Sequence, residues 1–354
     1  MLWRQARRTC GPWIAGRYTR AVDLLVSEVP GWFVLGAAFV FGSIWGSFFN
    51  VAIYRWPREL SVVRPPSQCP GCGAPVAARY NVPILGYLFL RGKAACCGTK
   101  LSARYPMVEA LSGVLCAAIA HRFILGVDPE TVLWRATAIA LCYFAFVGGL
   151  IIATFVDLEH MQIPDEVSLP GAALGLASAA LRDPTRVADF AFGAGVGFLL
   201  VQLVFVWSYE HLFGRRGMGE GDSKLLMMIG AFLGYQGVLF AMFAGAAQGL
   251  IAFVIARLSG AGKDVAPEQQ KASESAAVAV QPDGVEHSVE PERVSKPGRD
   301  DKHAHEDDID LEGEPGPEYW GHMKLPFGPF LALGALEFLF FGDAAIEAWV
   351  RFMS

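Results

Sequence analysis

Residues 132–157 read VLWRATAIALCYFAFVGGLIIATFVD, an apolar run that ends directly at a carboxylate. A helix needs roughly 20 apolar residues to cross a bilayer, and this run is long enough. Its charged side chain, Arg135, lies near one end and can reach the membrane surface. An ionised carboxylate such as that of Asp157 is costly to place in lipid. The stretch therefore predicts a membrane-spanning helix whose end places a carboxyl group beside water or a partner.

Comparable apolar runs recur along the whole chain. The 354 residues are 53% hydrophobic and only 18% charged, whereas soluble domains carry roughly 25% charged residues. This composition argues against an ordinary soluble protein and predicts an all-α polytopic integral membrane protein with about eight transmembrane helices. The short run 225–235 could be half of a broken helix. The other strong runs are 31–54, 107–125, 189–208, 237–257 and 327–341, and weaker ones lie at 166–181 and 225–235.

Charge is distributed unevenly along the chain, whose net charge is −5. Segment 260–325 holds 16 acidic and 7 basic residues, a balance of −9, so the remainder carries +4. This segment is rich in Pro, Glu and Ser and almost free of aromatic residues, which predicts a disordered insert, either a solvated linker or a regulatory tail. Residues 1–30 are basic and lack a cleavage signature, so we expect a surface segment there rather than a cleavable signal peptide.

The loop 55–106 indicates the orientation in the membrane. It holds eight Lys and Arg residues against one acid, Glu59, and such an excess is typical of cytoplasmic loops. The first 30 residues also carry five Arg, which argues for the opposite placement, but the larger loop is favoured. Counting spans onward places Asp157, Asp222 and the acidic insert on the cytoplasmic side.

Asp157 and Asp222 stand at the ends of two different predicted spans and could converge in the bundle. Two close carboxyl groups cannot both ionise cheaply, so they share one proton. One can then activate water while the other protonates a leaving amine, which is the chemistry of aspartic proteases. Alternatives remain open: Asp222 could only cap a helix, and Asp157 could join a cation site. The additional ligands for that site would be Glu159, His160 and Asp165.

Residues around Asp222 suggest a path for substrate. In GMGEGDSK, Gly217, Gly219 and Gly221 leave the backbone bare beside the carboxylate, so an extended peptide could approach it. Lys224 either anchors the helix at the membrane surface or acts on Asp222. Asn50, in GSFFNV of the first span, either packs helices together or contacts the site. Glu109, which begins the second span, is expected to pair with Arg104.

A second candidate site lies in the cytoplasmic loop. Cys69-Pro-Gly-Cys72 has the spacing of a zinc knuckle in a compartment where disulfides are disfavoured. A structural Zn²⁺ prefers four ligands, and the remaining loop cysteines are the adjacent Cys96 and Cys97. Adjacent cysteines can rarely both reach one tetrahedral metal, so the fourth ligand is either Cys96 or water. A metal-free loop and a redox role are the alternatives.

The order of six motifs resembles that of bacterial prepilin peptidases, the type IV leader peptidases. The resemblance covers roughly residues 35–258 and 324–345. That family usually has CxxC after RGK, whereas this chain has Ala94 at the first of those positions and keeps Cys97, which puts the zinc and the methyl transfer in question. The motifs are GSFFNV (46–51), CPGC (69–72), RYPMVE (104–109), DLEHMQIPD (157–165), GMGEGDSKLL (217–226) and PFGPFLALG (326–334).

The resemblance implies an inner-membrane aspartyl protease that cuts prepilins or pseudopilins at the cytoplasmic face, after the Gly that ends a basic leader. Its two catalytic aspartates correspond to Asp157 and Asp222. Many members also methylate the new amino terminus with S-adenosylmethionine. The implied partners are these substrates and membrane lipid, with no nucleic acid. A presenilin-like protease is disfavoured, because Val156 precedes Asp157 where that family favours Tyr.

A proton-coupled transporter with paired carboxylates is the alternative from another class, although it would need its acids at the bilayer midplane. The whole chain divides into six predicted segments. These are the basic segment 1–30, the first span 31–54, a cytoplasmic Cys-containing domain 55–106, the protease core 107–258, the acidic insert 259–325, and the final span with the C-terminus, 326–354.

Overall fold

The computed structural model describes residues 24–69, 71–214, 219–259 and 326–353. Residues 1–23 of the basic segment, the acidic insert from residue 260 to 325, and Gly217 lie outside the described residues. One compact unit includes the described residues up to Leu250 and those from Pro326 onward, and a second begins at Ile251.

The described part of the chain is helical, with three isolated β-bridges and no strand. Five of its helices are long and apolar enough to cross a membrane, which confirms the predicted all-α polytopic membrane class. These five are Gly31–Arg58, Arg104–Leu125, Leu133–His160, Val187–Leu212 and Glu220–Leu258.

The predicted number of eight spans is not confirmed. The run 166–181 falls on the short helices α6 (Asp165–Ala177) and α7 (Ala179–Arg182). The run 327–341 falls on α12 (Gly328–Met353), whose apolar part is shorter than a full span. The run 225–235 is the first part of the long helix α10 (Glu220–Leu258).

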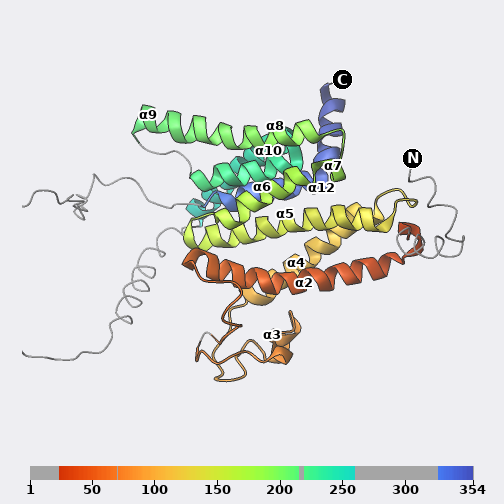
Figure 1. The fold of residues 1–354 in the computed structure, drawn as a ribbon. Helices are drawn as coiled ribbons and strands as arrows, with labels where there is room; N and C mark the ends of the chain where they lie inside the picture. Colours follow the sequence, from red (N-terminus) through yellow and green to blue (C-terminus); the bar gives the residue numbers. More distant parts are fainter. Residues whose placement is uncertain (1–23, 70, 215–218, 260–325, 354) are drawn as a thin grey trace, which may run out of the picture. The chain divides into compact units, whose positions relative to one another are not determined.

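Small residues let the first two spans pack closely. Helix α2 (Gly31–Arg55) lies against α4 (Arg104–Ala120), as Figure 1 shows. A Cβ added at Gly46 would lie 2.7 Å from the Cα of Glu109, and one added at Gly113 would lie 2.5 Å from Oγ of Ser43. Membrane helices associate through such small-residue contacts because lipid offers no hydrophobic drive between them.

Helix α5 (Leu133–His160) carries the centre of the core. It contacts α2, α4, α6 and α12. The ring of Phe146 stacks on Phe232 of α10, with centroids 4.6 Å apart, and both side chains are almost fully buried. Because α5 is enclosed by its neighbours, its last turn holds Asp157 inside the bundle.

Helix α10 is broken at Gly234, whose φ of 76° is a left-handed conformation that favours glycine. Helix α8 (Val187–Leu200) packs closely there, because a Cβ at Gly193 would lie 2.4 Å from the Gly234 backbone. Arg182 donates to the carbonyls of Ala231 and Phe232, both at 2.8 Å. The positive charge of Arg182 complements the dipole at the end of this helix segment. The non-helical backbone at Gly234 confirms the expectation that the run 225–235 is part of a broken helix.

The cysteine-containing loop connects α2 to α4 in the sequence, lies to one side of these two packed helices and has little regular structure (Figure 1). Its helical elements are η4 (Trp56–Arg58), η5 (Ala78–Tyr80) and α3 (Leu85–Phe89). The remaining described elements are η3 (Val26–Glu28), η6 (His121–Leu125), η7 (Val201–Ser208) and α9 (Tyr209–Phe213).

Candidate functional site

Asp157 lies in the last turn of α5 and is 6% exposed. Its Oδ2 accepts a hydrogen bond of 2.9 Å from the backbone N–H of Gly328, the first residue of α12. The positive end of a helix dipole therefore faces this carboxyl group. The close approach depends on glycine, because a Cβ at position 328 would lie 2.7 Å from the same oxygen.

Asp222 lies in the first turn of α10 and is 8% exposed. Its Oδ2 accepts a hydrogen bond of 3.3 Å from the N–H of Gly219, which precedes the helix. This is the reach-back hydrogen bond of a helix-capping carboxylate. Asp222 thus does cap α10, as the simpler interpretation expected, and this capping also fixes the carboxyl group at the helix end.

The structure brings Asp157 and Asp222 into one neighbourhood. Ile163, in the connection from α5 to α6, touches the glycine beside each aspartate: a Cβ added at Gly221 would lie 2.9 Å from Cβ of Ile163, and one at Gly328 would lie 3.2 Å from its Cδ1. Three separate chain segments therefore meet around the two carboxyl groups.

Lys224 does not pair with either aspartate of the dyad. Its Nζ donates to both carboxylate oxygens of Asp165, at 2.6 and 2.7 Å, and so ties the start of α10 to the start of α6. Gly219 is exposed, whereas Gly221 is half-buried against Ile163. The contact with Ile163 gives Gly221 a packing role beside any role in admitting substrate.

Asn50 is buried, and its amide donates to the carbonyls of Gly46 and Tyr105 at 3.3 and 3.1 Å. The hydrogen bond to Tyr105 joins α2 to α4, which is the helix-packing alternative. The expected pair of Glu109 with Arg104 is wrong, because Arg104 pairs with Glu159 instead.

The alternative cation site around Asp157 is not assembled. Glu159 and Asp165 are each engaged by a basic side chain, and His160 lies 3.4 Å from Arg58. Within the described ranges, the residues able to hold a metal ion form one cluster, and its members are cysteines.

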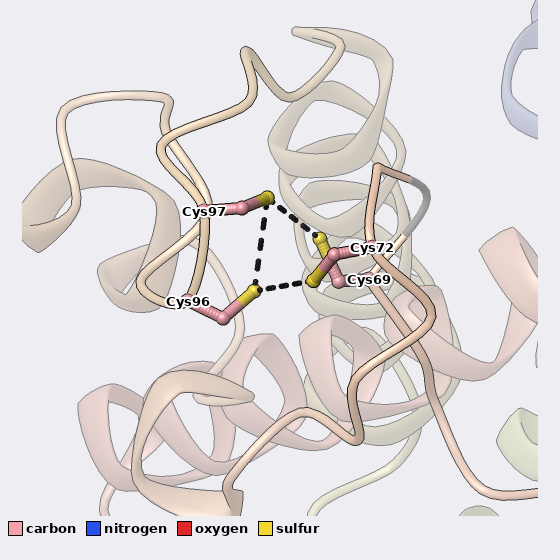
Figure 2. A group of neighbouring side chains, drawn as sticks. All are labelled: Cys69, Cys72, Cys96 and Cys97. Atoms are coloured by element: carbon pink, nitrogen blue, oxygen red, sulfur yellow. Dashed lines mark hydrogen bonds between the residues drawn. The ribbon is translucent and has the colours of Figure 1, made fainter.

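That cluster unites Cys69, Cys72, Cys96 and Cys97, whose sulfur atoms all lie within 4.8 Å of one another (Figure 2). The Cys69–Cys97, Cys72–Cys96 and Cys96–Cys97 sulfur distances are 3.6, 3.3 and 3.9 Å. Four sulfurs at about 2.3 Å from a tetrahedral zinc would lie about 3.8 Å apart. The four side chains therefore fit a structural zinc ion.

Two loops of the same form build the cluster. The N–H of Cys69 donates to Ala74 O and the N–H of Gly73 to Cys69 O. Twenty-five residues later, the N–H of Ala94 donates to Thr99 O and that of Gly98 to Ala94 O. Ala94 thus occupies the position of Cys69 without a thiol. The sulfur of Cys96, two residues after Ala94, completes the cluster instead. The adjacent Cys96 and Cys97 therefore both reach the same cluster, contrary to the expectation from the sequence.

The hydrogen bonds within the cluster shift the pKa values of two of its thiols in opposite directions. The Thr99 side chain lowers the pKa of Cys97 to about 6. The neighbouring thiols, Cys72 foremost, raise the pKa of Cys96 to about 12. Without a cation the cluster therefore does not carry four thiolates together at neutral pH, and metal binding would release protons.

Two residues were not assigned chemistry from the sequence. The sequence analysis assigned no role to Gly328, although the backbone amide of this residue in PFGPF donates to Asp157. Glu109 is 8% exposed, and its Oε2 accepts a 2.7 Å hydrogen bond from the backbone N–H of Ile84. A carboxylate in an apolar run was the available signal for Glu109; nothing in the sequence signals a backbone donor.

Comparison with known proteins identifies the family. Residues 40–123 match the Bacterial Peptidase A24 N-terminal domain and residues 144–254 the Type IV leader peptidase family. Three similar proteins are each named prepilin leader peptidase/N-methyltransferase. That of Myxococcus xanthus is 36% identical over 66% of this chain and 67% of its own length.

The relative from Aeromonas hydrophila is 32% identical over 62% of this chain and 81% of its own length. The relative from Neisseria gonorrhoeae is 34% identical over 64% of this chain and 84% of its own length. No solved structure matches the chain. The chain therefore belongs to the type IV leader peptidase family and is a peptidase.

Proposed function

We propose that the protein is an aspartyl endopeptidase of the bacterial inner membrane. It removes the leader from type IV prepilins or type II secretion pseudopilins after a Gly at the cytoplasmic face. The observation that carries this proposal is the meeting of Asp157 and Asp222 at the ends of two different spans. The same chain N-methylates the new amino terminus with S-adenosylmethionine, as the names of the relatives indicate.

The dyad performs hydrolysis with one shared proton. One carboxylate takes a proton from a water molecule, which attacks the scissile carbonyl carbon. The other carboxyl group gives its proton to the departing amine, so the C–N bond breaks with a neutral leaving group. The backbone amides of Gly328, at the start of α12, and Gly219, just before α10, hold the two groups in place throughout. Each proton transfer contributes on the order of 10²–10⁴ in rate.

The membrane position suits a prepilin. Such a substrate is held by its own apolar helix with the basic leader in the cytoplasm, so its scissile bond lies at the membrane surface. Asp157 and Asp222 both lie at helix ends rather than in the middle of their spans. This position favours hydrolysis over the transporter alternative, which needs its carboxylates at the midplane. We also propose that the chain is organised in the six segments predicted from the sequence, with residues 55–106 as a separate cytoplasmic domain.

The direct test uses the purified full chain in detergent with a synthetic prepilin. Mass spectrometry then follows two products: the released leader and the mature amino terminus with or without an added methyl group. Leader release with an unmethylated terminus would retain the peptidase and remove the methyltransferase. Failure to release the leader would contradict the proposal.

We also propose that the four cysteines bind a structural Zn²⁺, with Cys96 supplying the thiolate that Ala94 does not. We expect Cys96→Ala to lower zinc content from about one ion per chain to well below half, because a three-thiolate site is incomplete. Cys96→Ala combined with Ala94→Cys should restore it, since the Ala94 loop already has the hydrogen bonds of the Cys69 loop. Metal analysis of the purified variants measures this.

Buried Cys116 lies in α4, outside the loop, and Cys116→Ala is the matched control. Full zinc content in Cys96→Ala would show that water or another group completes the site. Absence of zinc in the unaltered protein would favour the metal-free or redox alternatives.

The Lys224–Asp165 ion pair is proposed to position the dyad rather than to act in the reaction. Charge reversal at either residue should lower the kcat of leader cleavage by about 3- to 10-fold, because the start of α10 would shift relative to α6. The double variant Lys224→Asp with Asp165→Lys should recover most of this loss. Unchanged kcat in both single variants would assign the pair to surface solvation alone.

A further inference from the structure

Helix α3 of the cysteine-containing loop has an exposed apolar face. Its members Leu85, Leu88 and Phe89 are 49%, 61% and 80% exposed. They stand at positions i, i+3 and i+4, so they share one face of the helix. Buried Gly86 packs elsewhere, since a Cβ added to it would lie 2.2 Å from the carbonyl oxygen of Tyr80. A contiguous exposed apolar face of this kind marks a contact with a membrane or a partner.

A hydrogen bond fixes the level of α3 along the membrane-spanning helices. The N–H of Ile84, the residue before α3, donates to Oε2 of Glu109 at 2.7 Å. The span Arg104–Leu125 has 22 residues. It is about 33 Å long at 1.5 Å per residue, and the hydrocarbon core is roughly 30 Å thick.

The span therefore has almost no length to spare outside the hydrocarbon core. Glu109 lies about 7 Å along the helix from Arg104, within the roughly 5–10 Å to which interfacial helices bury their apolar faces. Because Ile84 is bonded to Glu109, α3 begins at the level of the lipid rather than in the water beyond the span.

The apolar face of α3 adjoins the lipid-facing surface of α2. Val82 and Pro83, just before α3, line a cavity of about 400 Å³ together with Ile44 and Phe48 of α2. Ile44 and Phe48 are exposed within a membrane span, where lipid covers them. Figure 1 shows α3 alongside α2 rather than beyond its end. Lipid that covers α2 at this level therefore also reaches α3.

Basic side chains follow α3 closely. Arg91 and Lys93 are exposed and lie within four residues of its end. The loop 55–106 holds eight basic residues against one acid, Glu59, so its positive charge is not cancelled within the loop. Arg and Lys side chains extend from an apolar level to a polar one, and basic residues beside a membrane are attracted to anionic lipid.

We propose that α3 anchors the cysteine-containing loop to the bilayer. The apolar face of α3 inserts into the hydrocarbon edge of one leaflet, and Arg91 and Lys93 contact the phosphates of anionic phospholipid. The Arg104–Glu159 ion pair joins this end of α4 to the last turn of α5, where Asp157 lies. The loop is therefore anchored to the leaflet beside the dyad. This inference goes beyond the proposed function, because it requires neither cleavage nor methylation.

Phe89 and Val63 provide a matched pair of positions for a lipid-crosslinking test. Both lie in the loop and are similarly exposed, at 80% and 78%. Val63 is held at the charged end of α2, because Arg55 donates to the carbonyls of Ser61 and Pro65 on either side of it. Val63 should therefore stay outside the hydrocarbon, whereas Phe89 should lie in it.

The photoreactive amino acid p-benzoylphenylalanine replaces Phe89 or Val63 in the full chain. Each protein is placed in nanodiscs that contain phosphatidylglycerol and is irradiated, and intact-mass spectrometry identifies the attached molecule. We expect a phospholipid adduct at position 89 with a yield at least about fivefold higher than at position 63. Thermal unfolding of both proteins checks that they are folded.

Charge reversal after α3 tests the contact with phosphate. We expect Arg91→Glu combined with Lys93→Glu to lower the adduct yield at position 89 by about threefold or more, because acidic side chains repel anionic lipid. Arg64→Glu, at an exposed residue beside Val63, is the control and should leave the yield unchanged. An unchanged yield in the double variant would overturn the phosphate contact.

Absence of a lipid adduct at position 89, or equal yields at positions 89 and 63, would overturn the membrane anchor. An adduct with the mass of a second chain would also overturn it, because the apolar face of α3 would then be an interface between copies. The reaction contains no prepilin, so its result does not depend on whether the protein cleaves a leader. Failure of the proposed peptidase activity would likewise leave the adduct at position 89 unaffected.

Discussion

Asp157→Asn and Asp222→Asn should each lower the kcat of leader cleavage by about 10³-fold or more, because the proposed mechanism would lose either its base or its acid. Asparagine can still accept the hydrogen bond that Gly328 or Gly219 donates, so the local structure should remain. What asparagine cannot do is carry the negative charge or release a proton. The measurement is single-turnover cleavage of a synthetic prepilin by the detergent-purified variants.

Asp128→Asn is the control for this pair, since Asp128 is an exposed acid in the connection between α4 and α5. Its kcat should match that of the unaltered protein. The double variant Asp157→Asn with Asp222→Asn should be no slower than either single variant, because the two groups act as one unit. Full activity in either single variant, in a preparation free of the native enzyme, would rule out the dyad.

The membrane helices, and the positions of the two aspartates at the ends of spans, could be predicted from the sequence because both depend on local patterns. Span length follows from apolar runs, and Asp157 and Asp222 stand where such runs begin or end. The break within α10 was also foreshadowed by the short run 225–235. Its position at Gly234 could not be derived, since it depends on α8 packing against the Gly234 backbone.

The features that the sequence did not predict arise from contacts between distant segments. The hydrogen bond to Asp157 comes from a backbone amide 171 residues away, and a backbone donor leaves no mark in composition or spacing. The position of Cys96 depends on a loop whose hydrogen bonds Ala94 can make as well as Cys69 does. The sequence analysis paired Glu109 with Arg104, because its observed partner, the backbone N–H of Ile84, is brought near it only by the fold.

Gly328→Ala should lower the kcat of leader cleavage by about 10- to 100-fold, because displacing one catalytic group by up to 1 Å can cost about 10² in rate. A Cβ at this position would lie 2.7 Å from Oδ2 and 3.2 Å from Cγ of Asp157. The carboxyl group must then move, and its hydrogen bond to the start of α12 weakens. By contrast, a Cβ at Gly219 would lie 3.4 Å from Oδ2 of Asp222, an ordinary contact, so Gly219→Ala should cost less.

Two further glycine variants separate a direct effect on Asp157 from a general disturbance of packing. Gly334→Ala, in the same helix, would bring a Cβ to 3.0 Å from the backbone of Ala241, far along α12 from the dyad. Gly36→Ala meets no atom within 4 Å. If Gly328 acts by positioning Asp157, its variant should lose kcat with little change in thermal unfolding, whereas Gly334→Ala should lower the unfolding temperature more than kcat. Equal losses of kcat and stability in both variants would assign Gly328 to helix packing, and the amide of α12 would then have no special part in holding the Asp157 carboxyl group.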